Sequence, residues 1–296
     1  MKIQIDEISL PLLERKEVRI LVKRIDKINS SVSGNKWYKL KYNMLEAKRM
    51  GVNKVLTFGG AYSNHIIATA IAAKENGFAS IGIIRGNQNI HDNPTISLAK
   101  DYGMNIYYID RSQYENKEHA YFLNDLISRF GSFYMIPEGG TNKFGVMGAQ
   151  EIIDHNDTSN YICCPVGTGG TISGIINSSD SSQIIIGFSA IRNYNDLEKK
   201  INMYTSKKNW HLINKYVLGG YARINPSLIK FINNFYIDTG VALDAIYTGK
   251  MMMGILDLIS KDYFKEGSSI LVIHSGGMQG NKGMNERFNL DLPCKS

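Results

Sequence analysis

The sequence has few cysteines and no long apolar run. Its three cysteines are Cys163, Cys164 and Cys294, with no C-x-x-C pair. This odd, low number argues against a disulfide framework and a zinc site, so we expect no metal, and indicates buried thiols in a reducing compartment. No uncharged apolar run approaches the ~20 residues of a membrane helix. Met1 to Glu7 lack the apolar stretch of a signal peptide, so we expect a cytoplasmic protein without membrane association.

Charge of one sign is not concentrated in any segment. The net charge is +7, and the densest basic cluster, residues 36–49, alternates with apolar residues at the spacing of a solvated helix face. No nucleic-acid-binding motif occurs, so we expect no nucleic-acid partner. The 43% hydrophobic and 21% charged residues are typical of a soluble globular protein.

Short apolar segments alternate with longer segments of helical pattern. The predicted strands are 20–22, 55–58, 81–84, 106–109, 133–136, 161–166, 184–188 and 270–273. The predicted helices include 37–50, 65–76 and 251–261. Continuous apolar strands separated by helices are typical of βαβ units, so the sequence predicts an α/β protein with a mainly parallel sheet.

Four of the predicted strands end in glycine-rich turns, which follow Phe58, Ile136, Val166 and His274. At any single junction a tight turn is a sufficient explanation for the glycine. Ligands of open α/β sheets, however, bind beyond the carboxyl ends of the strands. The four junctions together therefore predict a ligand site at this edge of the sheet.

Lys36 is the candidate for attachment of an aldehyde cofactor. It follows Gly34 and Asn35, which let the chain turn just before a helix, whereas Lys39 and Lys41 lie further into that helix and rank below it. A lysine amine forms an imine with an aldehyde, and it must be partly desolvated to be nucleophilic near neutral pH. A solvated surface lysine is the alternative.

A glycine-rich loop after the strand 161–166 is a candidate phosphate-binding site that complements Lys36. The loop residues are Gly167, Thr168, Gly169, Gly170 and Thr171. No Lys-[Ser/Thr] pair closes the loop, and Ile172 stands where a dinucleotide fingerprint has its third glycine. Backbone N–H groups at a helix N-terminus can hold a phosphate without magnesium. The cofactor that needs both the lysine and such a loop is pyridoxal 5'-phosphate.

A second strand–helix junction carries Ser63, Asn64 and His65. Ser63 can simply cap the helix, whereas a functional interpretation places the Ser63 hydroxyl and the Asn64 amide at the ligand. His65 is a candidate substrate contact, although a structural role explains it as well. Tyr247 and Tyr221 are candidate proton donors or substrate contacts among 17 tyrosines.

Together these segments resemble the fold-type II pyridoxal-phosphate enzymes, and among them the aminocyclopropanecarboxylate deaminase and D-cysteine desulfhydrase family. The likeness spans nearly the whole chain in the family's order. The combination of Gly-Asn-Lys, Ser-Asn-His and Tyr-Thr-Gly-Lys is specific. The matching segments are 23–26, 34–40, 57–65, 137–142, 167–171, 247–250 and 274–277.

The resemblance implies a tryptophan-synthase-β-like fold with two open, mainly parallel sheets flanked by helices. Residues 1–47 and 149–296 would form a larger cofactor-binding domain. Residues 48–148 would form a smaller α/β domain that closes over the site. The same likeness implies a homodimer.

The resemblance also assigns cofactor contacts. Lys36 would bind the cofactor covalently, and Asn64 would bond to its ring hydroxyl. The loop 167–171 would hold the phosphate, and Ser275 would meet the pyridine nitrogen. A neutral hydroxyl stabilises a protonated pyridine less than a carboxylate does, which suits β-elimination better than transamination.

Two substrates of a lyase or deaminase stay open. D-cysteine would give pyruvate, hydrogen sulfide and ammonia, whereas 1-aminocyclopropane-1-carboxylate would give 2-oxobutanoate and ammonia. The family's deaminases resemble one another in a glutamate where this chain has Thr248 and an apolar residue where it has Ser275, so the resemblance favours the desulfhydrase. Thr248 would then contact the substrate, together with Ser63 and Tyr247. The set of Lys36, Ser63 and Tyr247 argues against a protein that only binds the cofactor or an amino acid.

Three departures from the family pattern indicate a divergent branch. Ile25 stands where an acidic residue is usual, and Ser33 replaces the first of two glycines before Asn-Lys. Gly219-Gly220-Tyr221-Ala222 replaces a Gly-Pro-Gly-Tyr-Gly-like run. Another small substrate, such as D-serine or a β-substituted alanine, therefore stays open.

Overall fold

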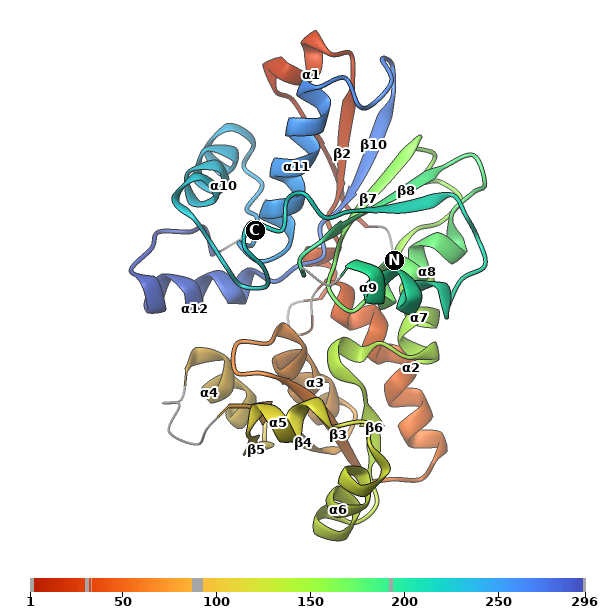
Figure 1. The fold of residues 1–296 in the computed structure, drawn as a ribbon, viewed down its shortest axis with the longest axis vertical. Coiled ribbons are helices and arrows are strands. Elements are labelled where there is room, and N and C mark those ends of the chain that lie inside the picture. Colours follow the sequence, from red (N-terminus) through yellow and green to blue (C-terminus); the bar gives the residue numbers. More distant parts are fainter. Residues whose placement is uncertain (1–2, 30–31, 33, 87–92, 192–193, 295–296) are drawn as a thin grey trace.

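The computed structural model describes all residues except 1–2, 30–31, 33, 87–92, 192–193 and 295–296. It contains two β-sheets, one above the other in Figure 1, with helices packed against both. The upper sheet combines strands from the two ends of the chain, and the lower sheet is built from one continuous segment.

The larger sheet has six strands in the order β1-β2-β10-β7-β8-β9. Their bounds are β1 (Ile5–Ile8), β2 (Arg19–Lys23), β7 (Tyr161–Val166), β8 (Ile184–Ser189), β9 (Trp210–Ile213) and β10 (Ser269–Ile273). The strands pair in parallel, except that β1 is antiparallel to β2. β10 lies between β2 and β7, so the centre of this sheet joins three distant parts of the chain.

Both faces of the larger sheet are buried, as the continuous apolar strands predict. In β10, Ile270 and Val272 pack on one face and Leu271 and Ile273 on the other. The first face is covered by α1 (Pro11–Arg15), α10 (Pro226–Thr239), α11 (Thr248–Ser260) and α12 (Met278–Phe288). The second is covered by α2 (Asn35–Arg49), α7 (Lys143–Ala149), α8 (Gly170–Ser178) and α9 (Tyr194–Asn202).

The two neighbouring cysteines of β7 follow the same alternation. Cys163 belongs to the first core and Cys164 to the second, and both are free and fully buried. Burial raises the pKa of both thiols above its ordinary value, so they stay protonated and unreactive. Cys294 is free and exposed.

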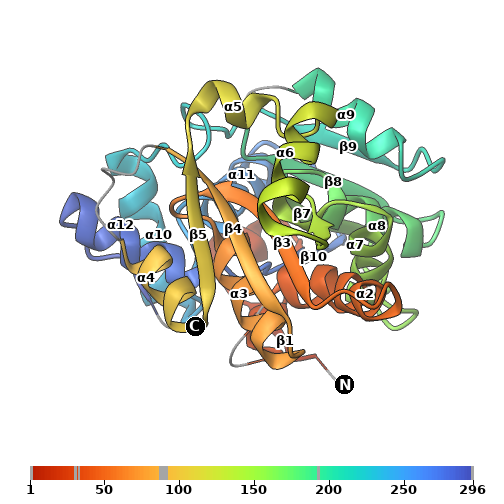
Figure 2. The same cartoon turned by 90° about the horizontal axis from the view of Figure 1, so that it is seen from below.

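The smaller sheet has four parallel strands in the order β5-β4-β3-β6. Their bounds are β3 (Lys54–Gly60), β4 (Ala79–Arg85), β5 (Met104–Ile109) and β6 (Tyr134–Ile136). The view from below shows β3, β4 and β5 side by side (Figure 2). The helices of this part are α3 (Asn64–Glu75), α4 (Pro94–Asp101), α5 (Arg111–Glu115) and α6 (Ala120–Phe130).

Helix α3 is buried on all sides because its residues 65–73 are apolar or small, apart from His65 and Thr69. It packs between the smaller sheet and α2. Three short 3-10 helices complete the fold: η1 (Ile25–Lys27), η2 (Glu138–Gly140) and η3 (Gln150–Ile152).

The predicted α/β class is confirmed, and so is its arrangement as two mainly parallel sheets flanked by helices. All eight predicted strands form, whereas the sequence did not predict the edge strands β1 and β9. The domain boundaries at 47/48 and 148/149 stay a prediction; they fall within α2 and α7, which pack against each other.

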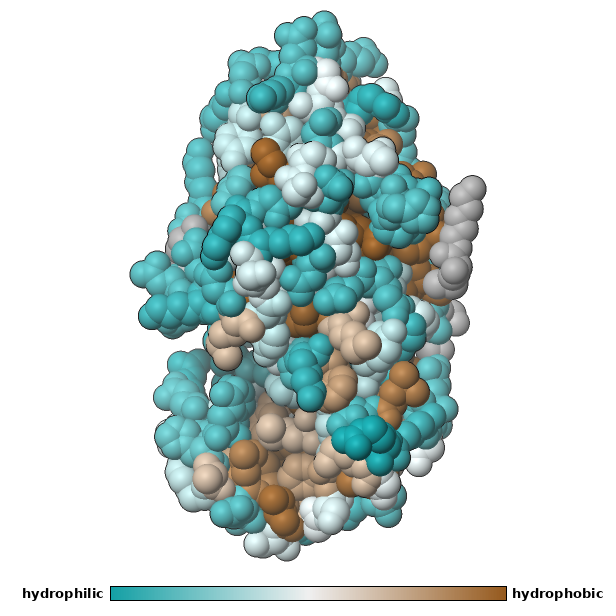
Figure 3. Space-filling model, turned by 90° about the vertical axis from the view of Figure 1, so that its right-hand side faces the viewer, coloured by the Kyte–Doolittle hydropathy of each residue, from teal (hydrophilic) through white to brown (hydrophobic). Residues whose placement is uncertain are grey.

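The surface is mixed in polarity. In the view from the right of Figure 1, hydrophilic side chains predominate over the upper part and apolar ones gather toward the lower end (Figure 3). Exposed apolar side chains on α2 and α7 include Leu45 and Met147. Among the described residues, no helix is long and apolar enough to cross a membrane.

Candidate active site

A cavity of about 660 Å³ opens beside the carboxyl ends of strands from both sheets. Its lining includes Gly60 at the end of β3, Arg85 at the end of β4, Val166 at the end of β7 and Ser275 just after β10. The predicted site residues that line it are Lys36, Ser63, Asn64, His65, Gly167, Thr168, Gly169, Thr171, Tyr221, Tyr247 and Ser275. The segments singled out in the sequence thus meet in one place.

The loop before α2 is held against the turn after β10. Gly34 has a φ of +68°, in the left-handed region, and a Cβ atom there would lie 2.1 Å from the carbonyl oxygen of Ser275. The Asn35 backbone N–H donates to that same carbonyl oxygen at 3.2 Å. Only glycine fits so close an approach. Gly34 therefore lets α2 begin at Asn35 and brings Lys36 to the cavity wall.

Lys36 is partly exposed, and its side chain lines the cavity. Its Nζ donates a long hydrogen bond of 3.4 Å to Asn35 Oδ1. Burial lowers the pKa of the Lys36 amine to about 8, because the surrounding protein disfavours the ammonium form. A large neutral fraction is then present near pH 8, as a nucleophilic amine requires.

The glycine-rich loop joins β7 to the N-terminus of α8. Gly169, with a φ of +88°, directly precedes the helix. The first backbone N–H groups of a helix have no partner within it, and they carry the positive end of the helix dipole. Asn35 Nδ2 donates to Thr171 Oγ1 at 2.8 Å, which ties this loop to the Lys36 segment. The loop can therefore receive an anion next to Lys36.

Lys39, which the sequence ranked below Lys36, also lines the cavity. It is 1% exposed, and its Nζ donates to Thr141 Oγ1 at 2.8 Å; Thr141 in turn shares a short hydrogen bond with Thr168. A Cβ atom on Gly170 would lie 2.8 Å from the Lys39 Nζ, so the amine touches the start of α8. Burial, with a smaller effect of Lys36, lowers the pKa of Lys39 well below its ordinary value. The three-residue spacing from Lys36, which puts both on one helix face, is the signal that could have identified Lys39.

Ser63 caps α3, since its Oγ accepts a hydrogen bond from the His65 N–H at 3.2 Å. Ser63 and Asn64 are also partly exposed to the cavity. His65 Nε2 lies 2.8 Å from Thr57 Oγ1, which donates to the Ile136 carbonyl oxygen. Burial lowers the pKa of His65 well below its ordinary value, so the ring is neutral. The imidazole thus ties α3 to Thr57 of β3, whose hydroxyl bonds to β6, and also borders the cavity.

Two tyrosines face each other at the cavity. The rings of Tyr221 and Tyr247 are 6.0 Å apart between centroids, at an angle of 66°. Burial raises the pKa of the Tyr247 hydroxyl well above its ordinary value, so the phenol stays protonated. A Cβ atom on Gly167 would lie 3.2 Å from the Tyr247 hydroxyl oxygen, so this hydroxyl reaches the glycine-rich loop. The cavity thus has a protonated phenol beside its glycine-rich loop.

Two predicted site residues do not line the cavity. Gly170 lies inside the first turn of α8. Thr248 has no exposed surface, and its hydroxyl donates to Asp244 Oδ1 at 2.7 Å and accepts from the Asp244 N–H at 2.8 Å. The side chain of Thr248 is directed away from the cavity, into the N-terminus of α11. Its predicted substrate contact finds no support in this geometry.

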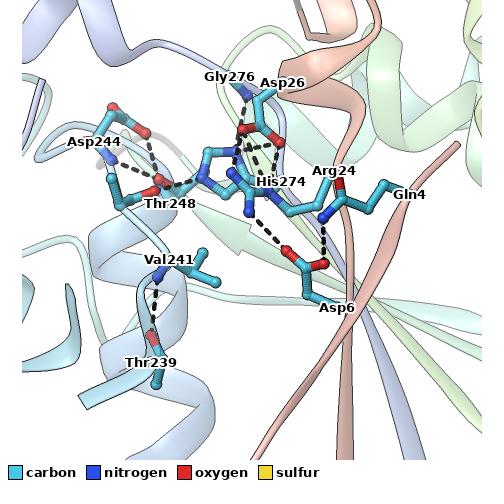
Figure 4. Close-up of polar contacts among 11 residues, drawn as sticks. Gln4, Asp6, Arg24, Asp26, Thr239, Val241, Asp244, Thr248, His274 and Gly276 are labelled. Atoms are coloured by element: carbon cyan, nitrogen blue, oxygen red, sulfur yellow. Dashed lines mark hydrogen bonds and ion pairs between the residues drawn. The ribbon is translucent and has the colours of Figure 1, made fainter. Parts of the chain in front are cut away.

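A buried charge network surrounds His274, the residue before Ser275 in the sequence (Figure 4). Arg24 is 2% exposed, and its Nη2 lies 2.8 Å from Asp26 Oδ2. The other Asp26 oxygen lies 3.4 Å from His274 Nδ1, to which the Gly276 N–H also points at 3.4 Å. These contacts fix the turn that carries Ser275. Arg24 and Asp26 lie in the family-like segment 23–26, but no role was predicted for either, because the sequence does not show that they are buried together.

Two side chains of opposite charge lie at the cavity, although the sequence did not predict either of them as a site residue. Arg85 is exposed, and its guanidinium carbon stands 5.4 Å from the centre of the Tyr114 ring. Glu138 lies 3.5 Å from Lys117 Nζ. Both line the cavity. Single charges at the ends of elements are common, so only the fold shows that these two reach the site.

The donors around the cavity fit pyridoxal 5'-phosphate. Lys36 supplies an amine of lowered pKa for the aldehyde. Lys39 is buried beside the α8 N-terminus without an ion pair among the described residues, as suits a dianionic phosphate. Ser275 supplies a neutral hydroxyl. Within the described part of the chain, no cluster of three or more His, Cys, Asp or Glu residues is placed to hold a metal.

Fold and site together define an α/β enzyme that works with pyridoxal phosphate. Comparison with known families agrees: the chain belongs to the family described as "Pyridoxal-phosphate dependent enzyme", whose model matches residues 7–276. The predicted cofactor is thereby confirmed.

Individual relatives are similar over most of their length. A Pyrococcus abyssi protein named "Putative 1-aminocyclopropane-1-carboxylate deaminase" is 28% identical over 293 residues, covering 92% of this chain and 88% of the relative. The Arabidopsis thaliana "Bifunctional D-cysteine desulfhydrase/1-aminocyclopropane-1-carboxylate deaminase, mitochondrial" is 29% identical, covering 88% and 72%. A solved structure described as an ACC deaminase homologue superposes with a TM-score of 0.81 at 25% identity, covering 96% and 94%.

Proposed function

We propose that this enzyme breaks down a small amino acid to a 2-oxo acid and ammonia, with D-cysteine as the substrate. The products are then pyruvate, hydrogen sulfide and ammonia, after uptake of one water. The observation that carries the proposal is the meeting of Lys36, Ser63 and Tyr247 at one cavity, which gives an amine, a small hydroxyl and a protonated phenol. Such a set suits proton removal at one carbon and proton supply to a leaving group at the next.

Residues on three segments would hold the cofactor. Lys36 would attach it, and Asn64 would bond to its ring hydroxyl. Residues 167–171 and Lys39 would hold the phosphate, and Ser275 would meet the ring nitrogen. When bound, pyridoxal phosphate supplies an electron sink that stabilises negative charge at the substrate Cα.

The chain's own groups would then move the protons. Lys36 accepts the proton from the substrate Cα, since its lowered pKa leaves a neutral amine. Tyr247 donates a proton to the sulfur that leaves Cβ, because burial keeps its phenol protonated. Ser63 and the backbone at the start of α3 would bind the substrate carboxylate, as helix N-termini do with anions. The backbone N–H of His65 would take part in binding this carboxylate. Tyr221 would close the side of the cavity opposite the start of α3.

Deamination of 1-aminocyclopropane-1-carboxylate to 2-oxobutanoate and ammonia is the second candidate. The names of the relatives favour it. Against it stand two departures from the pattern of the family's deaminases, Thr248 for a glutamate and Ser275 for an apolar residue; of these two, Ser275 lines the cavity and carries the argument. A protein that binds the cofactor or an amino acid without turnover is a remote third candidate, which the acid–base set opposes.

The test is to give the purified enzyme D-cysteine and 1-aminocyclopropane-1-carboxylate separately and to identify the 2-oxo acid by mass. Pyruvate from D-cysteine alone supports the proposal. 2-Oxobutanoate from the cyclopropane replaces it with the second candidate. Lys36→Ala is the control and should form neither product.

We further propose that the enzyme works as a homodimer in the cytoplasm. The dimer rests on the family likeness, and the exposed Leu45 and Met147 are compatible with a covered surface. Sedimentation of the purified protein tests the dimer, and a monomer at micromolar concentration would contradict it.

A further inference from the structure

The loop that carries Tyr221 has an unusual backbone. Leu218, Gly219, Gly220 and Ala222 all have positive φ, at +49°, +91°, +121° and +55°. Leu218 and Ala222 are not glycines, so their left-handed conformation is disfavoured for the isolated chain. Tyr221 sits among them, lines the cavity and is 43% exposed. A loop strained in this way keeps its shape only when other parts of the protein hold it.

Lys250 holds this loop. It lies in the first turn of α11 and is 2% exposed. Its Nζ donates to the carbonyl oxygen of Val217 at 2.9 Å and to that of Gly220 at 2.8 Å. Val217 directly precedes the strained segment and Gly220 lies within it, next to Tyr221, so one buried amine holds the loop at two points.

The environment of Lys250 marks it as more than a packed side chain. Among the described residues it forms no ion pair, although Asp244 attracts its charge. Burial lowers the pKa of the amine to about 8. Keeping a desolvated amine without a carboxylate partner is unfavourable, and an apolar side chain of similar length would fill the space without that cost. The hydrogen bonds to the loop explain its presence.

Helix α11 links the two tyrosines of the site. Tyr247 occupies its N-cap, three residues before Lys250, and faces Tyr221 at 6.0 Å between ring centroids. The helix therefore carries one ring directly and the other through the Lys250 hydrogen bonds. We propose that Lys250 is a positioning residue that fastens the Tyr221 loop over the cavity and so sets substrate affinity. The effect on affinity rests on the proposed function; the fastening of the loop does not.

The test compares Lys250→Met and Lys250→Gln with Lys261→Met, which makes the same change at the exposed C-terminal end of α11. Hydrogen exchange of the cofactor-loaded proteins is followed by mass for peptides covering 217–223. Both Lys250 variants should exchange faster in this loop alone, while the cofactor absorbance stays that of wild type because Lys36 is untouched. If a folded Lys250 variant exchanged at the wild-type rate in this loop, the hypothesis that Lys250 holds the loop would be wrong, whether or not the enzyme acts on D-cysteine.

Steady-state kinetics distinguish a role of Lys250 in positioning Tyr221 from a general effect on protein stability. Lys250→Met should raise KM about tenfold and leave kcat within about twofold of wild type. In a Tyr221→Ala background, the same change should alter KM by less than about twofold, because the loop then has no ring to position. Equal effects in both backgrounds would show that Lys250 acts only on stability. Absence of turnover in wild type would defeat the proposed function and leave the exchange result standing.

Discussion

At the scale of single residues, Gly34 determines how the attachment lysine is presented. Its positive φ and its contact with the Ser275 carbonyl bring two ends of the site together: the residue that would bind the aldehyde and the one that would meet the ring nitrogen. A side chain at this position would separate them. The glycine is thus required by geometry, and its position in the sequence before Asn-Lys has a physical reason.

Gly34→Ala should therefore unfold the site or destabilise the protein by roughly 2–4 kcal/mol, since backbone strain and a clash act together. Gly51→Ala is the matched control: Gly51 has the same φ of +68° but nothing within 4 Å of a Cβ atom. It should lose only about 1 kcal/mol. Urea unfolding measures both. Equal losses would mean that the Ser275 contact has no energetic importance.

The pH dependence of cofactor attachment follows from Lys36. Because burial lowers the pKa of the amine to about 8 from 10.5, its neutral form appears at lower pH than that of a free lysine. The rate at which cofactor-free protein takes up pyridoxal phosphate should rise from pH 6 and level off above about 8. Absorbance after mixing measures this rate. A midpoint near that of an exposed lysine peptide would contradict the desolvation of Lys36.

At the scale of elements, α2 presents Lys36 and Lys39 on one face and Lys41 on another. Lys41 pairs with Glu151 at 2.7 Å near the surface, whereas Lys39 is buried beside the start of α8. A buried amine without a carboxylate partner opposes folding, but it attracts a phosphate strongly. The same side chain should therefore affect stability and cofactor binding in opposite directions.

Lys39→Met should stabilise the cofactor-free protein and weaken binding of pyridoxal phosphate about tenfold or more. Binding of pyridoxal, which lacks the phosphate, should change little. Lys41→Met is the control and should leave both affinities unaltered. Equilibrium dialysis and thermal unfolding measure the two effects. An equal loss for pyridoxal would place Lys39 away from the phosphate.

The start of α11 is organised by Asp244, whose carboxylate accepts from the backbone N–H groups of Ile246, Tyr247 and Thr248 and from the Thr248 hydroxyl. Thr248→Glu, which introduces the residue of the family's deaminases, would put a second carboxylate against Asp244. It should destabilise the protein by about 2–4 kcal/mol without creating deaminase activity. Thr248→Ser keeps the hydroxyl and should be nearly neutral. Urea unfolding measures the stability of each variant, and product analysis measures its activity. A Thr248→Glu variant that is stable and active as a deaminase would contradict this prediction.

The sequence was most informative where one segment determines its own structure. The strand 161–166 was predicted with its observed bounds, since it is apolar throughout and ends in glycine. β1 and β9 were missed because they are short edge strands of four residues that exist only through pairing with β2 and β8. The same distinction holds for the site residues. Those in glycine-rich turns could be predicted from the local sequence, whereas the burial of the Lys250 side chain depends on tertiary contacts.

At the scale of the whole molecule, the cavity is enclosed by segments from both sheets. Lys36 and the glycine-rich loop belong to elements around the larger sheet, and Ser63 and Asn64 follow β3 of the smaller one. A ligand that contacts both parts stabilises their arrangement as well as each part.

Pyridoxal phosphate at a hundred times its dissociation constant should stabilise the protein by about 2.7 kcal/mol, which raises the melting temperature by roughly 4 °C for a chain of this size. Calorimetry with and without the cofactor measures the change. Lys36→Ala should keep part of it, since the phosphate contacts remain. An unaltered melting temperature in wild type would mean that the cofactor does not bind the folded protein.

The position of β10 has a consequence for biosynthesis. The smaller sheet comes from residues 54–136 and has all its strands once that segment has left the ribosome. The larger sheet cannot close until residue 273 has been made, because β10 is the strand that joins β2 to β7. Through most of translation β2 and β7 lack this neighbour and expose unpaired backbone. The nascent chain is therefore most open to misassembly, and most in need of chaperones, just before β10 appears.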